Sequence, residues 1–510
     1  MKVCDGLVLI IGMVAGAGCV ASHEPADDVP DGLATVTQGL TLQDRILACN
    51  QDPRVRIGVL SSDSCVGGDL FFRETFNGNG RSCASCHAVT RNFTIDPDFI
   101  ATLPANDPLF VAETNPNLAR LEIPKEMRQF GLILENVDGF APDPTTHFVL
   151  RSVPHTLSLA TSVTNPPGAP ATPANRTGWS GDGAPGTGAL RDFQTGAITQ
   201  HYTRSLARVP GTDFRLAVDG ELDRIDHFMR QLGRLNELSL ATIVLNDAGA
   251  EAGRQRFLTV GCNACHGNAG ANASFGGGGN RNFNTGVETA RNAELAPFPH
   301  DGGFLASPAN PDGSFGDGTF NTPPLIEAAD TGPFFHTATT ISGASAHNTA
   351  VATTIEEAIA FYDSPAFNNS PSGRAAPIDL TAVEIDNIGR FLRVLNATFN
   401  TALATTRFEA AGAMLKILGG QGFTTGTGLF RLAKVEVDDA LRVLNEVPDL
   451  GGAAKTALQD ASTALADMIA TSTVDGRKAK IDNIRTLLVT AANGFGSNLT
   501  YTIGDGPVMF

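Results

Sequence analysis

Two copies of one cysteine–histidine pattern carry the strongest chemical information in the sequence. They are Cys83-Ala84-Ser85-Cys86-His87 and Cys262-Asn263-Ala264-Cys265-His266. In Cys-x-x-Cys-His, two thiols can add to the vinyl groups of a haem while the adjacent imidazole ligates the iron from one face. A zinc site would need a further Cys or His cluster, and a redox dithiol would need a βαβ context, and we find neither. The motifs therefore predict two covalently attached haem c groups, with His87 and His266 as iron ligands.

What fills the opposite face of each iron decides the chemistry. An iron with two strong protein ligands transfers electrons, whereas an iron with an open face can bind peroxide or dioxygen. The chain has ten histidines, so the remaining candidates can be enumerated. They are His147, His155, His201 and His227 between the motifs, and His300, His336 and His347 after the second motif.

Length and composition place the chain among globular proteins with long loops. It has 510 residues, 55 of them glycine and 29 proline, which allows two to four domains. The formal charge of −17 disfavours nucleic acid and anionic lipid surfaces as partners, because both would repel the chain, and it leaves basic partner proteins open. Strand signals are sparse throughout, so we expect a mainly α fold.

The N-terminus has the layout of an export signal. An apolar stretch from Leu7 to Ala17 follows Lys2 and is too short to span a bilayer. We expect a signal peptide over 1–22, an acidic, proline-containing linker over 23–41 and a periplasmic or otherwise extracytoplasmic location, with no transmembrane span after signal removal. Cys19 could instead anchor a lipoprotein, although Gly16 stands where Leu is usual.

Two cysteines outside the motifs, Cys49 and Cys65, lie just ahead of the first motif. In an oxidising compartment they could form a disulfide bond. The alternative is a pair of buried thiols, since free cysteine often packs as a small apolar residue.

The order of features around the first motif recurs around the second. Residues 248–275 repeat the arrangement of residues 68–95, which is an apolar segment, the motif and then a loop rich in Gly and Asn. We therefore expect two cytochrome c-like haem lobes with long loops, over 42–235 and 236–400. Residues 401–510 contain no His or Cys and show apolar residues at helical spacing, so we expect a C-terminal helical appendage there.

Three segments after the second motif resemble one known family. They are Phe320-Asn321-Thr322-Pro323-Pro324-Leu325, Gly332-Pro333-Phe334-Phe335-His336 and the run from Thr354 to Tyr362. This order is similar to that of the bacterial di-haem cytochrome c peroxidase superfamily, which includes the enzyme that matures tryptophan tryptophylquinone and the related di-haem rubber oxygenases. The resemblance covers roughly residues 60–400.

In that family, the helix that here begins at Thr354 carries the second ligand of the C-terminal haem. The ligand is Met in the peroxidases and Tyr in the cofactor-maturing enzyme, and this chain has Tyr362 with no Met nearby. The resemblance therefore implies Tyr362 as an iron ligand and a lower potential than a Met-ligated haem would have. Ligation by His336 or His347, with Tyr362 only packing, stays open.

The only tryptophan, Trp179, lies in Gly178-Trp179-Ser180-Gly181-Asp182-Gly183. This segment resembles the family element that holds a Trp between the two haems, so the resemblance implies an electron relay at Trp179. Composition alone would assign Trp179 to the core.

The first haem departs from the family pattern. Family peroxidases place a Glu on its distal side as the acid and base for O–O cleavage, but no Glu lies in 193–201, so Gln200 or His201 would have to serve. His201 could also ligate iron or be structural. Residues 88–146 contain no His, so the ligand that family peroxidases release on activation is missing and the first haem would rest with an open face.

These observations favour a di-haem oxidoreductase that uses hydrogen peroxide at the first haem and transfers or stores electrons at the second. The alternatives are a dioxygenase of the rubber-oxygenase type, which would use dioxygen, and a non-catalytic di-haem electron carrier. The resemblance implies a small redox protein, such as a cytochrome c or a cupredoxin, as electron donor. It also implies a structural Ca²⁺ between the lobes.

Overall fold

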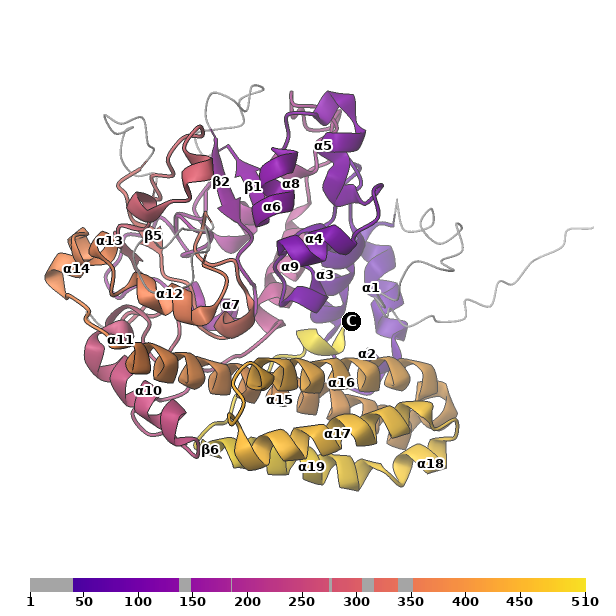
Figure 1. Cartoon of the computed structure of the whole chain (residues 1–510). Coiled ribbons are helices and arrows are strands. Elements are labelled where there is room, and N and C mark those ends of the chain that lie inside the picture. The colour runs from indigo at the N-terminus through magenta and orange to yellow at the C-terminus, as the bar shows by residue number, and fades with distance from the viewer. Residues whose placement is uncertain (1–39, 137–147, 185, 275–277, 305–315, 338–351) are drawn as a thin grey trace, which may run out of the picture.

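The computed structural model describes residues 40–136, 148–184, 186–274, 278–304, 316–337 and 352–510 (Figure 1). It is 54% helical with 6% strand, so the prediction of a mainly α fold is confirmed. The predicted signal peptide, with Cys19, and almost all of the predicted linker lie outside the described residues, as do His147 and His347.

The region over 42–235 is built around two packed helices, α3 (Ser62–Arg73) and α9 (Asp219–Gln231). A Cβ atom at Gly67 of α3 would collide with the backbone of Arg224 in α9, so the close approach of the two helices requires a glycine. The other elements of this region, with η for a 3₁₀ helix, are α1 (Leu42–Gln51), α2 (Pro53–Arg56), η1 (Cys83–Ser85), η2 (Val89–Arg91), α4 (Pro97–Thr102), η3 (Pro108–Phe110), α5 (Val111–Thr114), η4 (Pro116–Leu118), α6 (Pro124–Phe130), α7 (Leu159–Ser162), α8 (Leu190–His201) and the antiparallel pair β1 (Leu132–Glu135) and β2 (Val149–Ser152).

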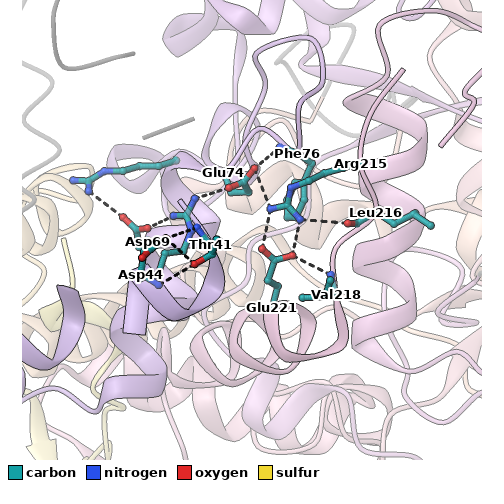
Figure 2. Close-up of polar contacts among 11 residues, drawn as sticks. Thr41, Asp44, Asp69, Glu74, Phe76, Arg215, Leu216, Val218 and Glu221 are labelled. Atoms are coloured by element: carbon teal, nitrogen blue, oxygen red, sulfur yellow. Dashed lines mark hydrogen bonds and ion pairs between the residues drawn. The ribbon is translucent and has the colours of Figure 1, made fainter. Parts of the chain in front are cut away.

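A buried ionic network joins α1, α3 and the start of α9. Arg45 of α1 pairs with Asp69 of α3 and with Glu74 just beyond it. Figure 2 shows how Glu74 connects onward to Arg215, which binds Glu221 through two hydrogen bonds of 2.7 and 2.8 Å. Because buried charges are costly unless paired, this network fixes the position of α3, the helix that leads into the first motif.

A disulfide bond joins Cys49 of α1 to Cys65 of α3. Of the two alternatives for these cysteines, the bonded one is confirmed. The bond and the ionic network both fasten α1 to the helix ahead of the first motif.

The region over 236–400 contains the second motif. α10 (Ala248–Val260) leads into α11 (Cys262–Cys265), which holds the cysteines of that motif. The remaining elements are β3 (Val244–Leu245), the antiparallel pair β4 (Asn282–Phe283) and β5 (Phe320–Asn321), η5 (Val287–Ala290), η6 (Ala293–Leu295), η7 (Ala328–Asp330), α12 (Ile355–Phe361), α13 (Pro365–Asn368) and α14 (Pro371–Ala375).

The C-terminal helices form a layer along one side of the molecule (Figure 1). α15 (Ala382–Leu418) packs against α10 and against α16 (Phe423–Asn445). α16 also packs against α17 (Gly452–Ala470), and α17 packs against α19 (Ile481–Phe495). The short helices η8 (Gly419–Gly422) and α18 (Val474–Lys478) link the longer ones. The expected boundary at residue 400 falls inside α15, because no proline interrupts this helix and its apolar residues continue without a break. No helix among the described residues is long and apolar enough to cross a membrane.

Residues 496–510 differ from the expected helical appendage because they return to the two regions that precede it. β6 (Gly496–Ser497) pairs with β3, η9 (Gly506–Val508) follows, and the C-terminal end of the chain lies beside α2 and α3 (Figure 1). The ring of Phe510 packs edge-on against Phe72 and Phe93, and the guanidinium of Arg54 donates to the Val508 carbonyl at 3.0 Å. Burial of this apolar segment makes it part of the first region's core.

Candidate functional site

One cavity of about 690 Å³ is lined by both Cys-x-x-Cys-His motifs. All six residues of the two motifs that could bind a haem contribute to its walls, and most of the other lining side chains are apolar. Its volume lies in the range of cofactor and ligand sites in proteins. The six motif residues are Cys83, Cys86, His87, Cys262, Cys265 and His266.

The first motif presents its histidine in a form that can ligate a metal. The backbone N–H of His87 donates to the Cys83 carbonyl at 2.9 Å, and the Nδ1 of His87 lies 2.8 Å from the Phe93 carbonyl oxygen. Burial lowers the pKa of His87, which keeps the imidazole neutral. With Nδ1 held by a carbonyl, Nε2 is the nitrogen left for a metal.

The second motif repeats this arrangement. The N–H of His266 donates to the Cys262 carbonyl at 2.9 Å, and its Nδ1 lies 3.0 Å from the Pro323 carbonyl oxygen. Burial lowers the pKa of His266 to about 4. Burial also raises the thiol pKa values, to about 12 for Cys262 and about 11 for Cys265. These donor sets fit a haem held by two thioethers and one imidazole at each motif.

One face of α8 lines the cavity near the first motif. Its lining residues recur at helical spacing and end with His201, whereas Gln200 is not among them. Gln200 instead donates from Nε2 to the Leu134 carbonyl at 2.8 Å. Adjacent residues on a helix point about 100° apart, so only one of the two candidates can face the cavity, and that one is His201.

Behind His201 lies a buried carboxylate that the sequence did not indicate, Glu122. Its Oε1 lies 3.8 Å from the Nδ1 of His201 and 2.7 Å from a guanidinium nitrogen of Arg81, and its Oε2 accepts from the N–H of Leu134 at 2.8 Å. Burial alone would raise the pKa of Glu122, but the charge of Arg81 and then His201 outweigh it and lower this pKa. The only local signal was a Glu between two apolar residues, Leu121 and Ile123.

A second group missed by the sequence reasoning is Tyr202, the residue after His201. Its hydroxyl donates to the Sγ of Cys83 at 3.2 Å. Burial, followed by the nearby thiols, raises the pKa of Tyr202 well above its ordinary value, so the hydroxyl keeps its proton. The aromatic residue therefore helps to fix the first cysteine of the motif.

Trp179 lies in the wall of the cavity, where the two regions meet. Its Nε1–H donates to the Ser152 carbonyl of the first region at 2.7 Å, and its own carbonyl accepts from the N–H of Asn321 in the second region. Its ring centroid is 6.1 Å from that of His336. The single tryptophan is thus positioned as a contact between the two halves of the site.

The two candidates for the second iron ligand differ in their surroundings, although both line the cavity. The Nε2 of His336 lies 2.8 Å from Glu288 Oε1, and its ring stacks on Phe320 at 3.9 Å between centroids. Tyr362 follows α12 and packs against the rings of Phe361 and Phe367. Burial and then the second-motif cysteines raise the pKa of Tyr362, which indicates that its hydroxyl lies near that motif.

The other described histidines have ordinary partners. His155 lines the cavity with a pKa lowered to about 4 by burial, and its Nε2 lies 3.4 Å from the Pro324 carbonyl oxygen. His227 lies 3.5 Å from the Ser61 hydroxyl, and His300 lies beside Glu288.

A separate cluster of carboxylates lies between η7 and α16. Glu327, Asp330 and Asp439 place oxygen atoms within 4.8 Å of one another, as they would around a metal ion. Burial, and next the charge of the neighbouring carboxylates, raises the pKa of Glu327 and of Asp330 well above ordinary values. The guanidinium of Arg442 pairs with Asp330 and with Asp439 at 2.5 Å each, and the amide of Asn396 donates to Glu327 at 2.7 Å, so protein groups supply part of the compensation for this negative charge.

No family model, curated protein or solved structure matches the chain. Its function must therefore be inferred from the cavity and the residues around it.

Proposed function

We propose that this protein is an exported di-haem c oxidoreductase that reduces hydrogen peroxide at the first motif and handles electrons at the second. The observation that carries the proposal is the single cavity lined by both motifs, in which each motif histidine has Nδ1 bonded to a backbone carbonyl. The regions over 42–235 and 236–400 would then be two cytochrome c-like lobes. The disulfide bond between Cys49 and Cys65 supports an extracytoplasmic location, because such bonds persist in oxidising compartments.

The motif residues would hold one haem each. Cys83 and Cys86 would form the thioethers of the first haem, with His87 as its iron ligand, and Cys262, Cys265 and His266 would do the same for the second. A haem so bound supplies an iron that exchanges electrons and, where one face is open, binds a small oxidant.

His201 is the residue that would move protons at the first centre. Because its Nδ1 faces the carboxylate of Glu122, Nε2 is the nitrogen left to take a proton from peroxide and return it to the departing oxygen. Arg81 keeps Glu122 ionised, and this carboxylate, 3.8 Å from Nδ1 of His201, would stabilise the imidazolium that forms when His201 takes up a proton. The apolar walls exclude bulk water, which strengthens these interactions.

At the second motif, Tyr362 would be a further protein ligand to the iron held by His266. The Nε2 of His336 is engaged by Glu288, which favours Tyr362 over His336. Trp179 bridges the two regions through its hydrogen bonds, so it would relay electrons between the centres. A small redox protein of the cytochrome c or cupredoxin class would supply them.

Optical and EPR spectra of the purified holoprotein, resting and reduced, test this proposal when hydrogen peroxide and dioxygen are then added separately. We expect one high-spin and one low-spin haem, a rapid spectral change with peroxide and peroxide consumption coupled to a reduced donor. A stable change with dioxygen alone would favour the dioxygenase. Two low-spin haems that react with neither oxidant would refute both enzyme functions and favour a non-catalytic electron carrier.

A further inference from the structure

Three side chains form a continuous hydrogen-bonded chain from the surface to the cavity. The Nδ1 of His300 lies 3.1 Å from Glu288 Oε2, and Glu288 Oε1 lies 2.8 Å from the Nε2 of His336. Side-chain exposure falls along this chain from 52% at His300 to 18% at Glu288 and 2% at His336. Each oxygen of the Glu288 carboxylate therefore contacts one imidazole.

The outer end of the chain has access to solvent. A surface hollow of about 300 Å³ is lined by His300 and Glu288, together with Asp301 and Asp317. Phe320 lines both this hollow and the main cavity, so the wall between the two spaces is thin at this point.

Glu288 differs from its neighbour Asp301 in its side-chain partners, which are two imidazoles instead of a hydrogen-bonded guanidinium. The guanidinium of Arg151 donates to Asp301 at 2.9 Å and compensates the negative charge of this carboxylate. Glu288 receives one backbone N–H, from Asp301 at 3.2 Å, and the nearby positive charge of Arg291, in addition to the two histidines.

The inner end of the chain contacts the groups assigned to electron transfer. The ring of His336 stacks on Phe320, lies 6.1 Å from the ring of Trp179 and forms part of the cavity wall. A proton delivered to His336 would therefore arrive beside the electron path.

We propose that His300, Glu288 and His336 form a proton relay that carries protons from solvent to the cavity beside Trp179. In each step, an N–H of His300 breaks as an O–H forms at Oε2 of Glu288. The carboxyl group then rotates to turn this hydrogen toward His336, and the O–H breaks as an N–H forms at Nε2 of His336, with His300 reprotonated by water. The net change is one proton moved inward without oxidation or reduction. The relay rests on the proposed function, since reduction of H₂O₂ to two waters by two electrons consumes two protons. Imidazole and carboxylate are the groups best suited to such transfers near neutral pH.

The test follows reduction of the holoprotein's haems by dithionite in stopped flow, in H₂O and in D₂O, with no peroxide present, because an electron added beside a buried, apolar cavity favours uptake of a proton that compensates its charge. We expect wild-type reduction of the second haem to slow in D₂O. Glu288→Gln, whose amide cannot pass a proton, should slow reduction about a hundredfold. His300→Gln breaks only the exposed link and should cause a smaller loss, because water in the hollow can still reach Glu288.

Glu294→Gln is the matched control, since Glu294 is an exposed carboxylate nearby that pairs with Lys125 at the surface. Haem content and thermal unfolding of each variant would show whether it is folded. Rates and isotope effects in Glu288→Gln and His300→Gln equal to those of the wild type and of Glu294→Gln would overturn the relay. If these variants slow haem reduction in a protein that does not consume peroxide, the proton relay is confirmed and the proposed peroxide reduction is wrong.

Discussion

Replacing Glu122 by Gln should lower the free energy of unfolding, because Glu122 forms a buried ion pair beside the first motif. Glu122 is 2% exposed and Arg81 is fully buried; they form a 2.7 Å ion pair, and Oε1 of Glu122 lies 3.8 Å from Nδ1 of His201. Removing one partner of a buried ion pair typically costs about 3–5 kcal/mol. Since Gln keeps an oxygen for the Leu134 N–H, and Arg81 keeps its bonds to two backbone carbonyls, we expect about 3 kcal/mol, near the lower end of that range.

The pH dependence of this loss has a definite sign. Arg81 and His201 hold the pKa of Glu122 below its ordinary value of 4.5 against the effect of burial, so its ionisation contributes stability at neutral pH. That stability is lost as the pH falls through the folded-state pKa. The difference between wild type and Glu122→Gln should therefore be full at neutral pH and shrink below pH 4.5.

Urea unfolding of both holoproteins, followed by circular dichroism, measures the difference. Glu113→Gln is the control, because Glu113 forms a partly exposed pair with Arg128 and should lose about 1 kcal/mol at most. A loss at Glu122 no larger than at Glu113, or one independent of pH, would refute this account of the buried pair.

Three further predictions concern other parts of the molecule. Trp179→Phe removes the 2.7 Å hydrogen bond to the Ser152 carbonyl and should slow electron exchange between the haems, with both haems still attached. Unchanged flash-photolysis kinetics would refute the role of Trp179 as an electron relay. Phe510→Ala should cost about 3–5 kcal/mol in urea unfolding, because the ring is buried against Phe72 and Phe93, whereas a loss under about 1 kcal/mol would mean that the segment is peripheral. The raised pKa of Glu327 means that its protonated form is favoured in the folded state, so the stability of the protein should fall as the pH rises above 4.5. Glu327→Gln should make this fall shallower in thermal unfolding measured across pH, and an unchanged slope would contradict the prediction.

The sequence predicted the features that depend on neighbours along the chain. The two motifs were recognisable because attachment and ligation need only five consecutive residues. The family resemblance implied a helix that begins at Thr354 and carries Tyr362; α12 spans Ile355–Phe361, with Thr354 at its N-cap in a capping box with Glu357 and Tyr362 at its C-cap. The disulfide bond was one of two open readings, which only the distance between α1 and α3 could decide.

Features that depend on contacts between distant segments could not be predicted in this way. Glu122 approaches His201 across 79 positions of the chain, and neither residue carries a local signal of the other. The sequence offered Gln200 and His201 equally, and only the orientation of α8 distinguishes them. The return of Phe510 to the first region likewise depends on an apolar site formed by α3 and the loop after the first motif.

The haem content of three forms of the protein tests the central claim most directly. Intact-mass spectrometry and the pyridine haemochrome assay should be applied to the mature wild type, to Cys83→Ala/Cys86→Ala and to Cys262→Ala/Cys265→Ala, each exported from a host that attaches haem to cytochromes c. We predict two covalently bound haems in the wild type and one in each variant. A wild type without haem, or one that keeps its full haem content when a motif is removed, would contradict the assignment of both motifs.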